Sequence, residues 1–524
     1  MEELFRKLEE NNVNYIEYKG QKKYFYEIYR DVQIISEFLH NRGLKQNDRI
    51  GLIASNCYEY LICDLACLAN GYILVSFHKN DKLNGVNELF SLYDLSYLIY
   101  DEFDKIYKNS KSKICSINEI TEIVKSKEPN FKNSLKINFT VGDIFSIIFT
   151  SGSTGTPKGL EIKLSSANEF INNCVRKFNL LSNDKILACL PMSQFSSRCY
   201  MYSAILIGFN ICLAKPSELM WAFRRFKPTL FQGVPFIFES IYDAFLKNLY
   251  TSKKKLFVFN IYMKLYNVLP KKILKKIQIA MFSEIHNLLG GNIRYLITGS
   301  APIPYAILKT FEAIGLKIYE GYGLIETGMI ALNYPNCNKM GSVGKILNNK
   351  EVIFDKNNQI IVKSVDLWGK KYLNTSESVN AQIFIGQNTI ATGDIGHIDS
   401  EGFLYLDGRA KEIIVMSTGE KVHPIEIENK INSSKYIKQT AVFGDGKPNL
   451  SAVIVPRDKN ISLDVINREI ANINNQMSKK SRISNFFISK EPFTIENHMM
   501  TSNLKLDREK IYSIFEKEIE AYYE

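Results

Sequence analysis

Five short apolar runs, each bounded by glycine, proline or serine, constrain the fold more than any other feature of this chain. Between residues 186 and 323 they read ILACLPM, FNICLAK, TLFQGVP, IRYLITGSA and LKIYEGYG. Such runs predict buried β-strands. The N-terminal region alternates similarly: helical spacing over residues 28–39, a stop at Gly43, then the apolar strand RIGLIAS. This alternation is typical of parallel α/β layers, which place ligands in polar loops at strand ends.

The pattern of apolar and polar residues changes near residue 340. The runs KEVIFDKNNQIIVKS and HIDSEGFLYLDGR carry short alternating strands and turn residues, so we expect antiparallel pairing there. After DGRAKEIIVMSTGEKVHP, a last unit mixes strands and helices. We therefore predict a large N-terminal domain over residues 1–408 and a small α+β C-terminal domain over residues 409–524, with the boundary near Gly408.

Composition places the chain among ordinary globular proteins, with 524 residues, 45% hydrophobic and 23% charged. Its net charge of +11 fits a mildly basic solvated surface. The charge also favours polyanionic partners: nucleotides, coenzyme A, acidic carrier proteins, membrane surfaces or nucleic acid. No nucleic-acid-binding module is recognisable. Nine cysteines without a CxxC pair, no visible signal peptide and no membrane-length apolar stretch predict a cytoplasmic location.

A hydroxyl-rich loop, FTSGSTGTPKGL (Phe149–Leu160), follows the apolar run DIFSIIF. Glycines let backbone N–H groups approach an anion, serine and threonine add hydroxyl donors, and Lys158 adds a positive charge. The loop is not a Walker loop, because Pro157 and Gly159 stand where that motif needs glycine and Ser or Thr. A strand leading directly into such a loop favours a different kind of phosphate-binding loop over a Gly/Ser linker.

The loop resembles the signature loop of the adenylate-forming superfamily, which includes acyl-CoA synthetases, luciferases and peptide-synthetase adenylation domains. Similar motifs follow in the family's order: TGSAP (Thr298–Pro302), EGYGLIETG (Glu320–Gly328), TGD (Thr392–Asp394) and DGRAKEIIVMSTGEKVHPIEIE (Asp407–Glu428). The segment PFTIENHMMTSNLKLDREKI ends as the family ends, with a lysine in a C-terminal loop. The resemblance covers nearly the whole chain. Softer motifs, such as LPMSQFSSR and YIKQTAVFGDGKPNLSAVIVP, are most similar to the long-chain fatty acyl-CoA ligases.

This resemblance implies a site for ATP and AMP. The residues that match its motifs are Thr150, Ser151, Gly152, Ser153, Thr154, Gly155, Lys158, Gly299, Ser300, Ala301, Pro302, Glu320, Gly321, Tyr322, Gly323, Asp394 and Arg409. By the same resemblance, the signature loop would wrap the β- and γ-phosphates and Tyr322 would stack on adenine. Asp394 would accept hydrogen bonds from the ribose, and Arg409 would contact ribose and phosphate.

The resemblance assigns catalysis to Lys505, Glu326 and Arg409. Lys505 would reach the α-phosphate and the substrate carboxylate, and Glu326 would hold Mg²⁺, which prefers carboxylate oxygen. Each motif residue also has a simpler interpretation, such as a core aromatic, a helix or turn carboxylate, a surface ion pair or a solvated lysine. We favour the functional roles because all of these residues stand at the family's positions.

The family also implies a mobile C-terminal domain. Lys411 matches the position about which this domain rotates between adenylation and thioester formation. Gly419 would then approach the thiol channel, and Gln194 would lie beside the acyl pocket.

Four residues depart from the family pattern: Ile325 replaces a threonine, Gln194 and Ser166 replace histidines, and His498 replaces a glycine. These changes bear on the substrate, the acceptor and the rate more than on the class of reaction.

Lysine clusters flank apolar helical patterns in SKKKLFVFNIYMKLYNVLPKKILKKIQ, residues 252–278. The pattern is typical of a solvated basic helix over the core. It also fits an anionic membrane surface or a docking surface for an acidic carrier protein.

Together these observations predict an ATP- and Mg²⁺-dependent acid–thiol ligase with an α/β fold. The acid is expected to be fatty or otherwise apolar, and the acceptor to be coenzyme A. One alternative acceptor is the phosphopantetheine arm of an acyl carrier protein. Another alternative, suggested by Ile325 and Gln194, is a degenerate, non-catalytic nucleotide-binding relative.

Overall fold

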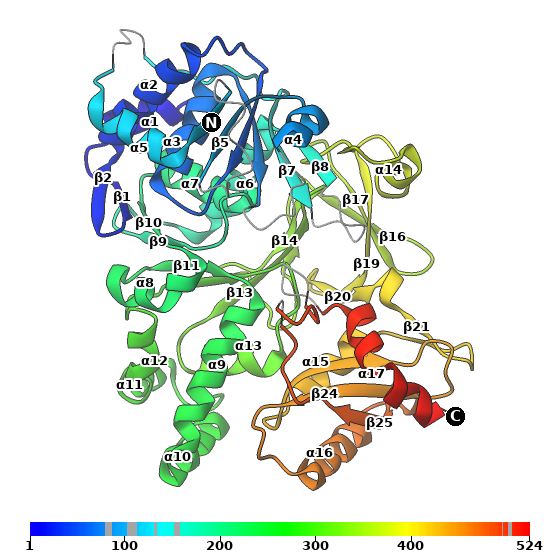
Figure 1. The fold of residues 1–524 in the computed structure, drawn as a ribbon. Helices are drawn as coiled ribbons and strands as arrows, with labels where there is room; N and C mark the ends of the chain where they lie inside the picture. Colours follow the sequence, from blue (N-terminus) through cyan, green and yellow to red (C-terminus); the bar gives the residue numbers. More distant parts are fainter. Residues whose placement is uncertain are drawn as a thin grey trace.

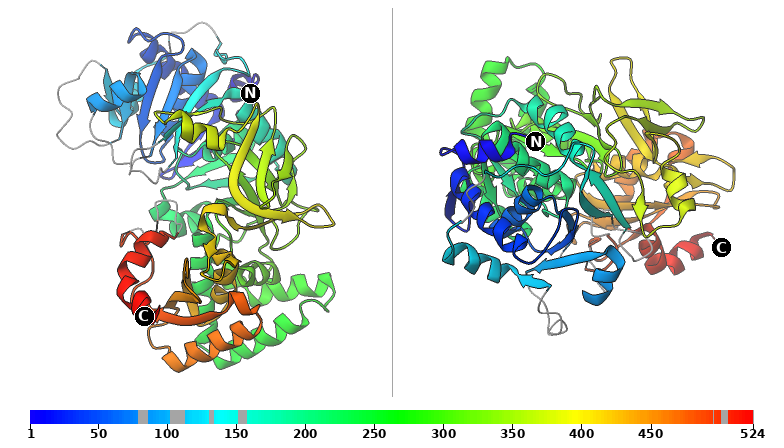
Figure 2. Two further views of the ribbon diagram at one scale, coloured as in Figure 1. Left: turned by 90° about the vertical axis from the view of Figure 1, so that its right-hand side faces the viewer. Right: turned by 90° about the horizontal axis from the view of Figure 1, so that it is seen from above.

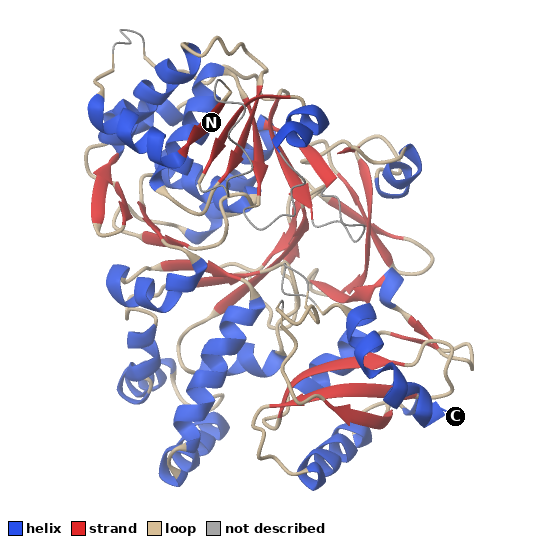
Figure 3. Cartoon of the chain, in the orientation of Figure 1, coloured by secondary structure: helices blue, strands red, loops and turns tan. Residues whose placement is uncertain are grey.

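The computed structural model describes residues 1–78, 86–101, 113–129, 134–150, 158–494, 496–500 and 506–523. Two large sheets with covering helices form the N-terminal part, and a smaller unit with its own sheet lies beyond them (Figures 1 and 3). This arrangement agrees with the predicted α/β class and with a large N-terminal and a small C-terminal domain.

The first large sheet has seven strands and holds the hairpin that carries the signature loop. In sheet order the strands are β18 (Tyr372–Leu373), β8 (Lys158–Lys163), β7 (Ile144–Thr150), β4 (Ile73–Phe77), β3 (Arg49–Ile53), β5 (Leu95–Tyr100) and β6 (Ile114–Ser116). Strands β7 to β6 run parallel, whereas β8 is antiparallel to both β7 and β18. The predicted strand RIGLIAS is β3.

The second large sheet has nine strands and contains all five apolar runs predicted as strands. In sheet order they are β15 (Lys345–Ile346), β14 (Gly328–Leu332), β13 (Ile318–Leu324), β12 (Tyr295–Thr298), β11 (Leu230–Gly233), β9 (Lys185–Ala188), β10 (Asn210–Leu213), β1 (Tyr15–Tyr18) and β2 (Gln21–Tyr24). Strands β13 to β1 run parallel, as predicted for this stretch.

Helices fill the space between the two large sheets and cover their outer faces. The N-terminal helices are α1 (Leu4–Glu10), α2 (Phe25–His40), α3 (Tyr58–Asn70), α4 (Val86–Tyr93), α5 (Ile117–Ser126), α6 (Leu164–Asn173) and α7 (Phe195–Ile207). Almost every described residue of α3 and α7 is buried. A helix that is apolar on all sides needs cover on all sides. Accordingly, one core cluster joins both sheets through these helices.

A buried ion pair fixes α7 inside this core. Arg198 donates to both carboxylate oxygens of Asp64 on α3, with Nη2···Oδ1 at 2.6 Å and Nε···Oδ2 at 3.0 Å. Its Nη1 donates to Ser146 on β7 at 2.6 Å. The Tyr202 hydroxyl also donates to Asp64, at 2.6 Å. Removing one partner of a buried ion pair is costly. The cluster therefore fixes the position of α7 relative to α3 and β7.

A second group of helices extends from the nine-stranded sheet. It comprises α8 (Leu219–Phe226), α9 (Pro235–Tyr250), α10 (Lys253–Leu265), α11 (Lys271–Met281), α12 (Ser283–Leu288) and α13 (Tyr305–Ala313). Their apolar faces share a separate core cluster. Helices α9, α10 and α11 project at the end opposite the seven-stranded sheet (Figure 1). Among the described residues, no helix combines the length and apolar character needed to cross a bilayer.

The region after residue 340 is antiparallel, as predicted. Its four-stranded sheet has the order β16 (Glu351–Phe354), β17 (Gln359–Lys363), β19 (Thr389–Ile398) and β20 (Leu404–Arg409), and α14 (Glu377–Ile383) precedes β19. The C-terminal elements are β21 (Ile414–Val415), β22 (Lys421–Val422), α15 (Pro424–Asn432), β23 (Ile437–Phe443), β24 (Leu450–Pro456), α16 (Leu463–Asn475), β25 (Ile483–Ile488) and α17 (Arg508–Tyr523). Strands β23, β24 and β25 form a sheet beside α9 (Figure 2).

Candidate active site

Two predicted nucleotide-binding segments meet on neighbouring parallel strands, β12 and β13. The loop Gly299–Pro302 follows β12, and Glu320–Gly323 lies within β13. A Cβ atom on Gly299 would lie 2.9 Å from the carbonyl oxygen of Gly321, so only glycine allows this approach. Ser300 has a φ of +72°, a left-handed conformation uncommon outside glycine. Backbone strain of this kind is often found at ligand-binding sites.

Tyr322, Asp394 and Arg409 form one connected group. The Tyr322 hydroxyl donates to Asp394 Oδ2 at 2.6 Å, and Arg409 Nε lies 2.9 Å from Asp394 Oδ1. Asp394 on β19 and Arg409 on β20 are cross-strand partners. Burial and the neighbouring Asp394 raise the pKa of Tyr322, so its hydroxyl stays protonated and donates. The Arg409 side chain is 41% exposed, which leaves its remaining donors accessible to an anion.

Glu326 follows β13 and is linked to the signature hairpin. The Tyr372 hydroxyl donates to Glu326 Oε1. Tyr372 lies on β18, which pairs with Gly159 and Leu160 of β8. The backbone N–H of Gly369 also donates to the Glu326 carbonyl, at 3.2 Å. Sequence analysis did not single out Tyr372, because nothing local connects it to a residue 46 positions earlier.

A buried polar cluster supports the backbone just after Glu326. Lys350 Nζ donates to the carbonyl of Thr327 at 2.8 Å and lies 3.6 Å from Glu169. Glu169 also accepts from the indole N–H of Trp368, at 2.9 Å. Burial lowers the pKa of Lys350, and the charge of Glu169 opposes that effect. Trp368 in turn packs so closely on Gly328 that no side chain fits there.

The signature loop closes the β7–β8 hairpin. Thr150 and Lys158 are cross-strand partners at its two ends, and the Lys158 side chain is half-buried. The predicted phosphate-binding residues Ser151, Gly152, Ser153, Thr154 and Gly155 lie outside the described residues.

Lys505 also lies outside the described residues, but the segments on either side of it are fixed. Met500 and Leu506 form an isolated antiparallel bridge, and the N–H of Asp507 donates to the Met499 carbonyl at 3.0 Å. Next along the chain, Arg508 binds both carboxylate oxygens of Glu428, at 2.5 and 2.7 Å.

The predicted hinge and thiol-side residues lie in two exposed turns that follow Arg409 along the chain. Lys411 is exposed in a short 3₁₀ turn, Ala410–Glu412, directly after β20. Gly419 has a φ of +80° and is exposed in the turn between β21 and β22. A left-handed glycine suits that tight turn.

Gln194 precedes α7 and is half-buried. Near this helix, a small and mostly apolar hollow lies among β9, α7 and β11. Its lining includes Ala188, Leu190, Ser197, Tyr200, Met201 and Gln232. The hydroxyl of Ser197 is buried and has no partner among the described residues.

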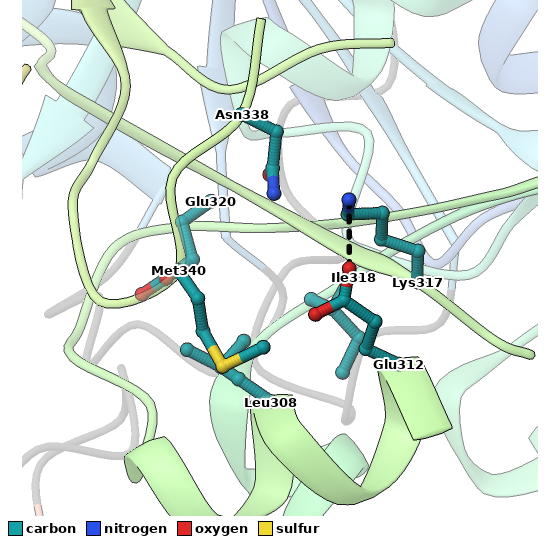
Figure 4. Close-up of a pocket in the computed structure, with 7 residues that line it drawn as sticks. All are labelled: Leu308, Glu312, Lys317, Ile318, Glu320, Asn338 and Met340. Carbon is teal, nitrogen blue, oxygen red and sulfur yellow. Dashed lines mark ion pairs between the residues drawn. The ribbon is translucent and has the colours of Figure 1, made fainter. Parts of the chain in front are cut away.

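Glu320 lines another hollow, on the side of β13 that faces α13 (Figure 4). Burial raises its pKa to about 8, and a hydrogen bond from the Gly341 backbone partly offsets this. Glu320 is therefore largely protonated at neutral pH. The only ion pair drawn in this hollow joins Lys317 to Glu312, at 2.8 Å.

The departures from the family pattern have distinct surroundings. Ile325 is half-buried and packs against the main core. Ser166 on α6 is buried, and its hydroxyl has no partner among the described residues. His498 is exposed and has a φ of +60°, which explains why glycine suits that position.

Residues 6–365 match the AMP-binding enzyme family, and residues 411–524 match the AMP-binding enzyme C-terminal domain. The chain therefore belongs to the AMP-binding enzyme family. This membership confirms the predicted superfamily and enzyme class, an AMP-forming ligase of the acyl-CoA synthetase type.

Among similar proteins is the long-chain-fatty-acid–CoA ligase FadD15 of Mycobacterium bovis, 25% identical over 92% of this chain and 89% of its own length. The chloroplastic long-chain-fatty-acid–[acyl-carrier-protein] ligase AEE15 of Arabidopsis thaliana is 24% identical over 94% of this chain and 82% of its own length. The same fold occurs in the O-succinylbenzoate coenzyme A synthetase MenE of Bacillus subtilis, solved in complex with ATP and a magnesium ion. It has a TM-score of 0.71 at 20% identity and covers 97% of this chain and 99% of its own.

Proposed function

We propose that this enzyme activates a fatty or other apolar carboxylic acid with ATP and transfers the acyl group to coenzyme A. The acid carboxylate would attack the α-phosphate of ATP, giving an acyl-adenylate and pyrophosphate. The thiol would then attack the acyl carbonyl and release AMP. Bringing two anions together requires fixed cations and oriented donors around the phosphates.

The observation that carries this proposal is the Tyr322–Asp394–Arg409 group. Asp394 offers a carboxylate to ribose hydroxyls while its own geometry is fixed by Tyr322 and Arg409. Asp394 is buried, and a buried carboxylate is tolerated where it is paired and hydrogen-bonded, as this one is. Its preservation argues against a degenerate relative, even though Ile325 and Gln194 depart from the family pattern.

A magnesium ion suits the residues present. Mg²⁺ commonly binds one or two protein carboxylates together with substrate phosphates, so Glu326 alone is an adequate protein ligand. Tyr372 would orient that carboxylate. The described residues hold no cluster of three or more metal-binding side chains, which is consistent with an ion that arrives with ATP. When bound, it would neutralise phosphate charge.

The remaining roles follow the resemblance and stay proposals. Lys505 would hold the α-phosphate and the substrate carboxylate, and the loop after Thr150 would hold the β- and γ-phosphates. The acyl chain would approach on the side of Gln194 and α7, where a small hollow is lined mostly by apolar groups. The fatty substrate is supported by the name of the Mycobacterium relative.

A carrier protein is the second candidate acceptor. One similar protein is named as a ligase for an acyl carrier protein, and the net charge of +11 would attract an acidic carrier. The deciding experiment gives the enzyme one preformed adenylate and compares thioester formation with coenzyme A and with phosphopantetheinylated carriers as acceptors. If a carrier were loaded and coenzyme A did not react, the carrier would replace coenzyme A as the proposed acceptor, and the adenylation proposal would be unaffected.

ATP–pyrophosphate exchange over a panel of straight-chain and aromatic acids tests adenylation itself. Asp394→Asn should lower exchange by about ten- to 150-fold, the loss expected for a charge-assisted hydrogen bond. Asp399→Asn is the matched control, because Asp399 comes directly after β19, the strand that carries Asp394, and likewise pairs with a cation, Lys339, at 2.7 Å. No exchange with any acid would favour the degenerate alternative.

A further inference from the structure

Helix α10 carries apolar side chains on two opposite sides. Phe259 and Tyr262 are buried against the helical core cluster. Phe257, Ile261 and Leu265, spaced one turn apart, are 65%, 42% and 45% exposed. A surface helix ordinarily has one apolar stripe, which faces the core. The second stripe has no cover among the described residues, so a solvated basic helix does not account for it.

The exposed apolar surface continues beyond this helix. Eight of the 25 exposed large hydrophobic side chains of the described residues lie between Tyr250 and Met281. They include Val268, 78% exposed after α10, and Ile273 on α11. A cluster of exposed apolar side chains indicates an interaction surface, whereas exposed apolar side chains scattered singly do not. The exposed apolar side chains of α10, α11 and their connection are called the α10–α11 patch below.

The helices that carry the patch are firmly anchored. The Tyr262 hydroxyl of α10 and the Gln278 side-chain amide of α11 both donate to the carbonyl of Ala313, the last residue of α13. Both helices are therefore held against the C-terminal end of α13. They lie at the end of the molecule opposite the seven-stranded sheet (Figure 1).

The charged side chains of the patch segment itself are all lysines, and Lys255 pairs with Glu284 of the neighbouring helix α12 at 4.0 Å. Between Thr251 and Ser283 the chain has eight lysines and no aspartate or glutamate. Lys253, Lys254, Lys264, Lys272, Lys275 and Lys276 are exposed. Apolar side chains flanked by lysines on a helix suit the interface of an anionic bilayer, where apolar groups insert and cations meet lipid phosphates.

We propose that the α10–α11 patch attaches this enzyme to anionic lipid bilayers. The patch is a projecting helical surface with a separate apolar stripe and a lysine border, which matches a flat, negatively charged partner with an apolar interior. This inference is independent of the acyl acceptor and of the catalytic residues.

Vesicle co-sedimentation tests the proposal with the full chain. Vesicles of phosphatidylcholine mixed with phosphatidylglycerol should bind the enzyme, and vesicles of phosphatidylcholine alone should bind it far less. The variant Lys272→Gln/Lys275→Gln/Lys276→Gln should lose roughly fivefold in partition coefficient per lysine. Phe257→Gln/Ile261→Gln should lower binding to the mixed vesicles, and the salt dependence that the lysines produce should remain.

Two controls make substitutions of the same kinds elsewhere, at two lysines and at one exposed leucine. Lys479→Gln/Lys480→Gln removes exposed lysines, and Leu463→Gln removes a side chain that is 57% exposed on α16. Both controls should bind vesicles as the unaltered enzyme does, and thermal unfolding establishes that every variant is folded. Equal binding by patch and control variants would overturn the proposal. The proposal would also be overturned if the enzyme did not bind vesicles and the patch variants instead lost a dimer or a complex with an acidic carrier protein.

Discussion

Ile325 offers a test of whether a packing side chain stands where the nucleotide site could use a hydroxyl. The resemblance predicts threonine there, and the structure packs the isoleucine against the main core. Ile325→Thr should restore a phosphate-facing hydroxyl and raise the adenylation rate by up to about tenfold. It should also cost roughly 1–2 kcal/mol of stability through lost packing. Pyrophosphate exchange and thermal unfolding measure the two effects.

Ile325→Val is the control, since it removes one methylene and adds no hydroxyl. It should destabilise slightly without raising the rate. If both variants have the same adenylation rate, the hydroxyl has no role at this position.

His498 offers a test of backbone strain in the segment that leads to Lys505. Its φ of +60° is unfavourable for a residue with a Cβ atom, and its side chain is exposed. His498→Val should destabilise the C-terminal domain by about 1–2 kcal/mol, because a β-branched residue tolerates this conformation poorly. His498→Gly should be neutral or stabilising. Chemical denaturation measures both, and equal stability of the two variants would show that the left-handed conformation is absent in solution.

At the scale of elements, the contact between the β12 loop and β13 should govern nucleotide binding. A Cβ atom on Gly299 would press on the Gly321 carbonyl and separate the two loops. Gly299→Ala should therefore raise the KM for ATP by roughly tenfold or more, since about 1.4 kcal/mol of lost binding is a factor of ten. Gly142→Ala is the control, because a Cβ atom on Gly142 meets no atom within 4 Å. An unchanged KM in Gly299→Ala would remove this loop from the nucleotide site.

Sequence reasoning worked for elements whose signal is local. The five apolar runs all became strands of one sheet, because burial on both faces leaves a short continuous apolar pattern. Tyr322, Asp394 and Arg409 were found through motifs, and the structure joins them. The Glu169–Trp368 bond was not predictable, because its partners are 199 positions apart and neither has a motif. The same holds for Arg198 and Asp64, separated by 134 positions.

At the scale of the whole molecule, the carboxyl group of Glu239 should make the contact between α9 and the C-terminal unit depend on pH. Arg457, which follows β24, binds Asp243 on α9 and donates to the Ser434 carbonyl at 3.3 Å. Glu239 lies one turn earlier on α9. Burial and the nearby Asp243 raise its pKa from 4.5 to about 7, and Arg457 and Lys438 act in the opposite direction.

Where the C-terminal unit supplies the burial around Glu239, the contact favours the protonated form of this carboxyl. The contact should be strongest below pH 4.5 and should weaken as the pH rises through about 7. Spin labels at Lys247→Cys and Lys459→Cys, both exposed, report the separation of the two parts. Glu239→Gln should remove this pH dependence. A distance distribution that responds to pH identically in Glu239→Gln and in the unaltered enzyme would assign the effect to other groups.

The most direct test of the central claim follows the oxygen atoms of the acid. The enzyme is given ATP, coenzyme A and an acid whose carboxylate carries a heavy-oxygen label, and the products are weighed by mass spectrometry. Attack on the α-phosphate transfers one labelled oxygen to AMP, so we predict labelled AMP together with unlabelled pyrophosphate. Label in inorganic phosphate with ADP as the other product, or AMP without label, would contradict acyl-adenylate formation.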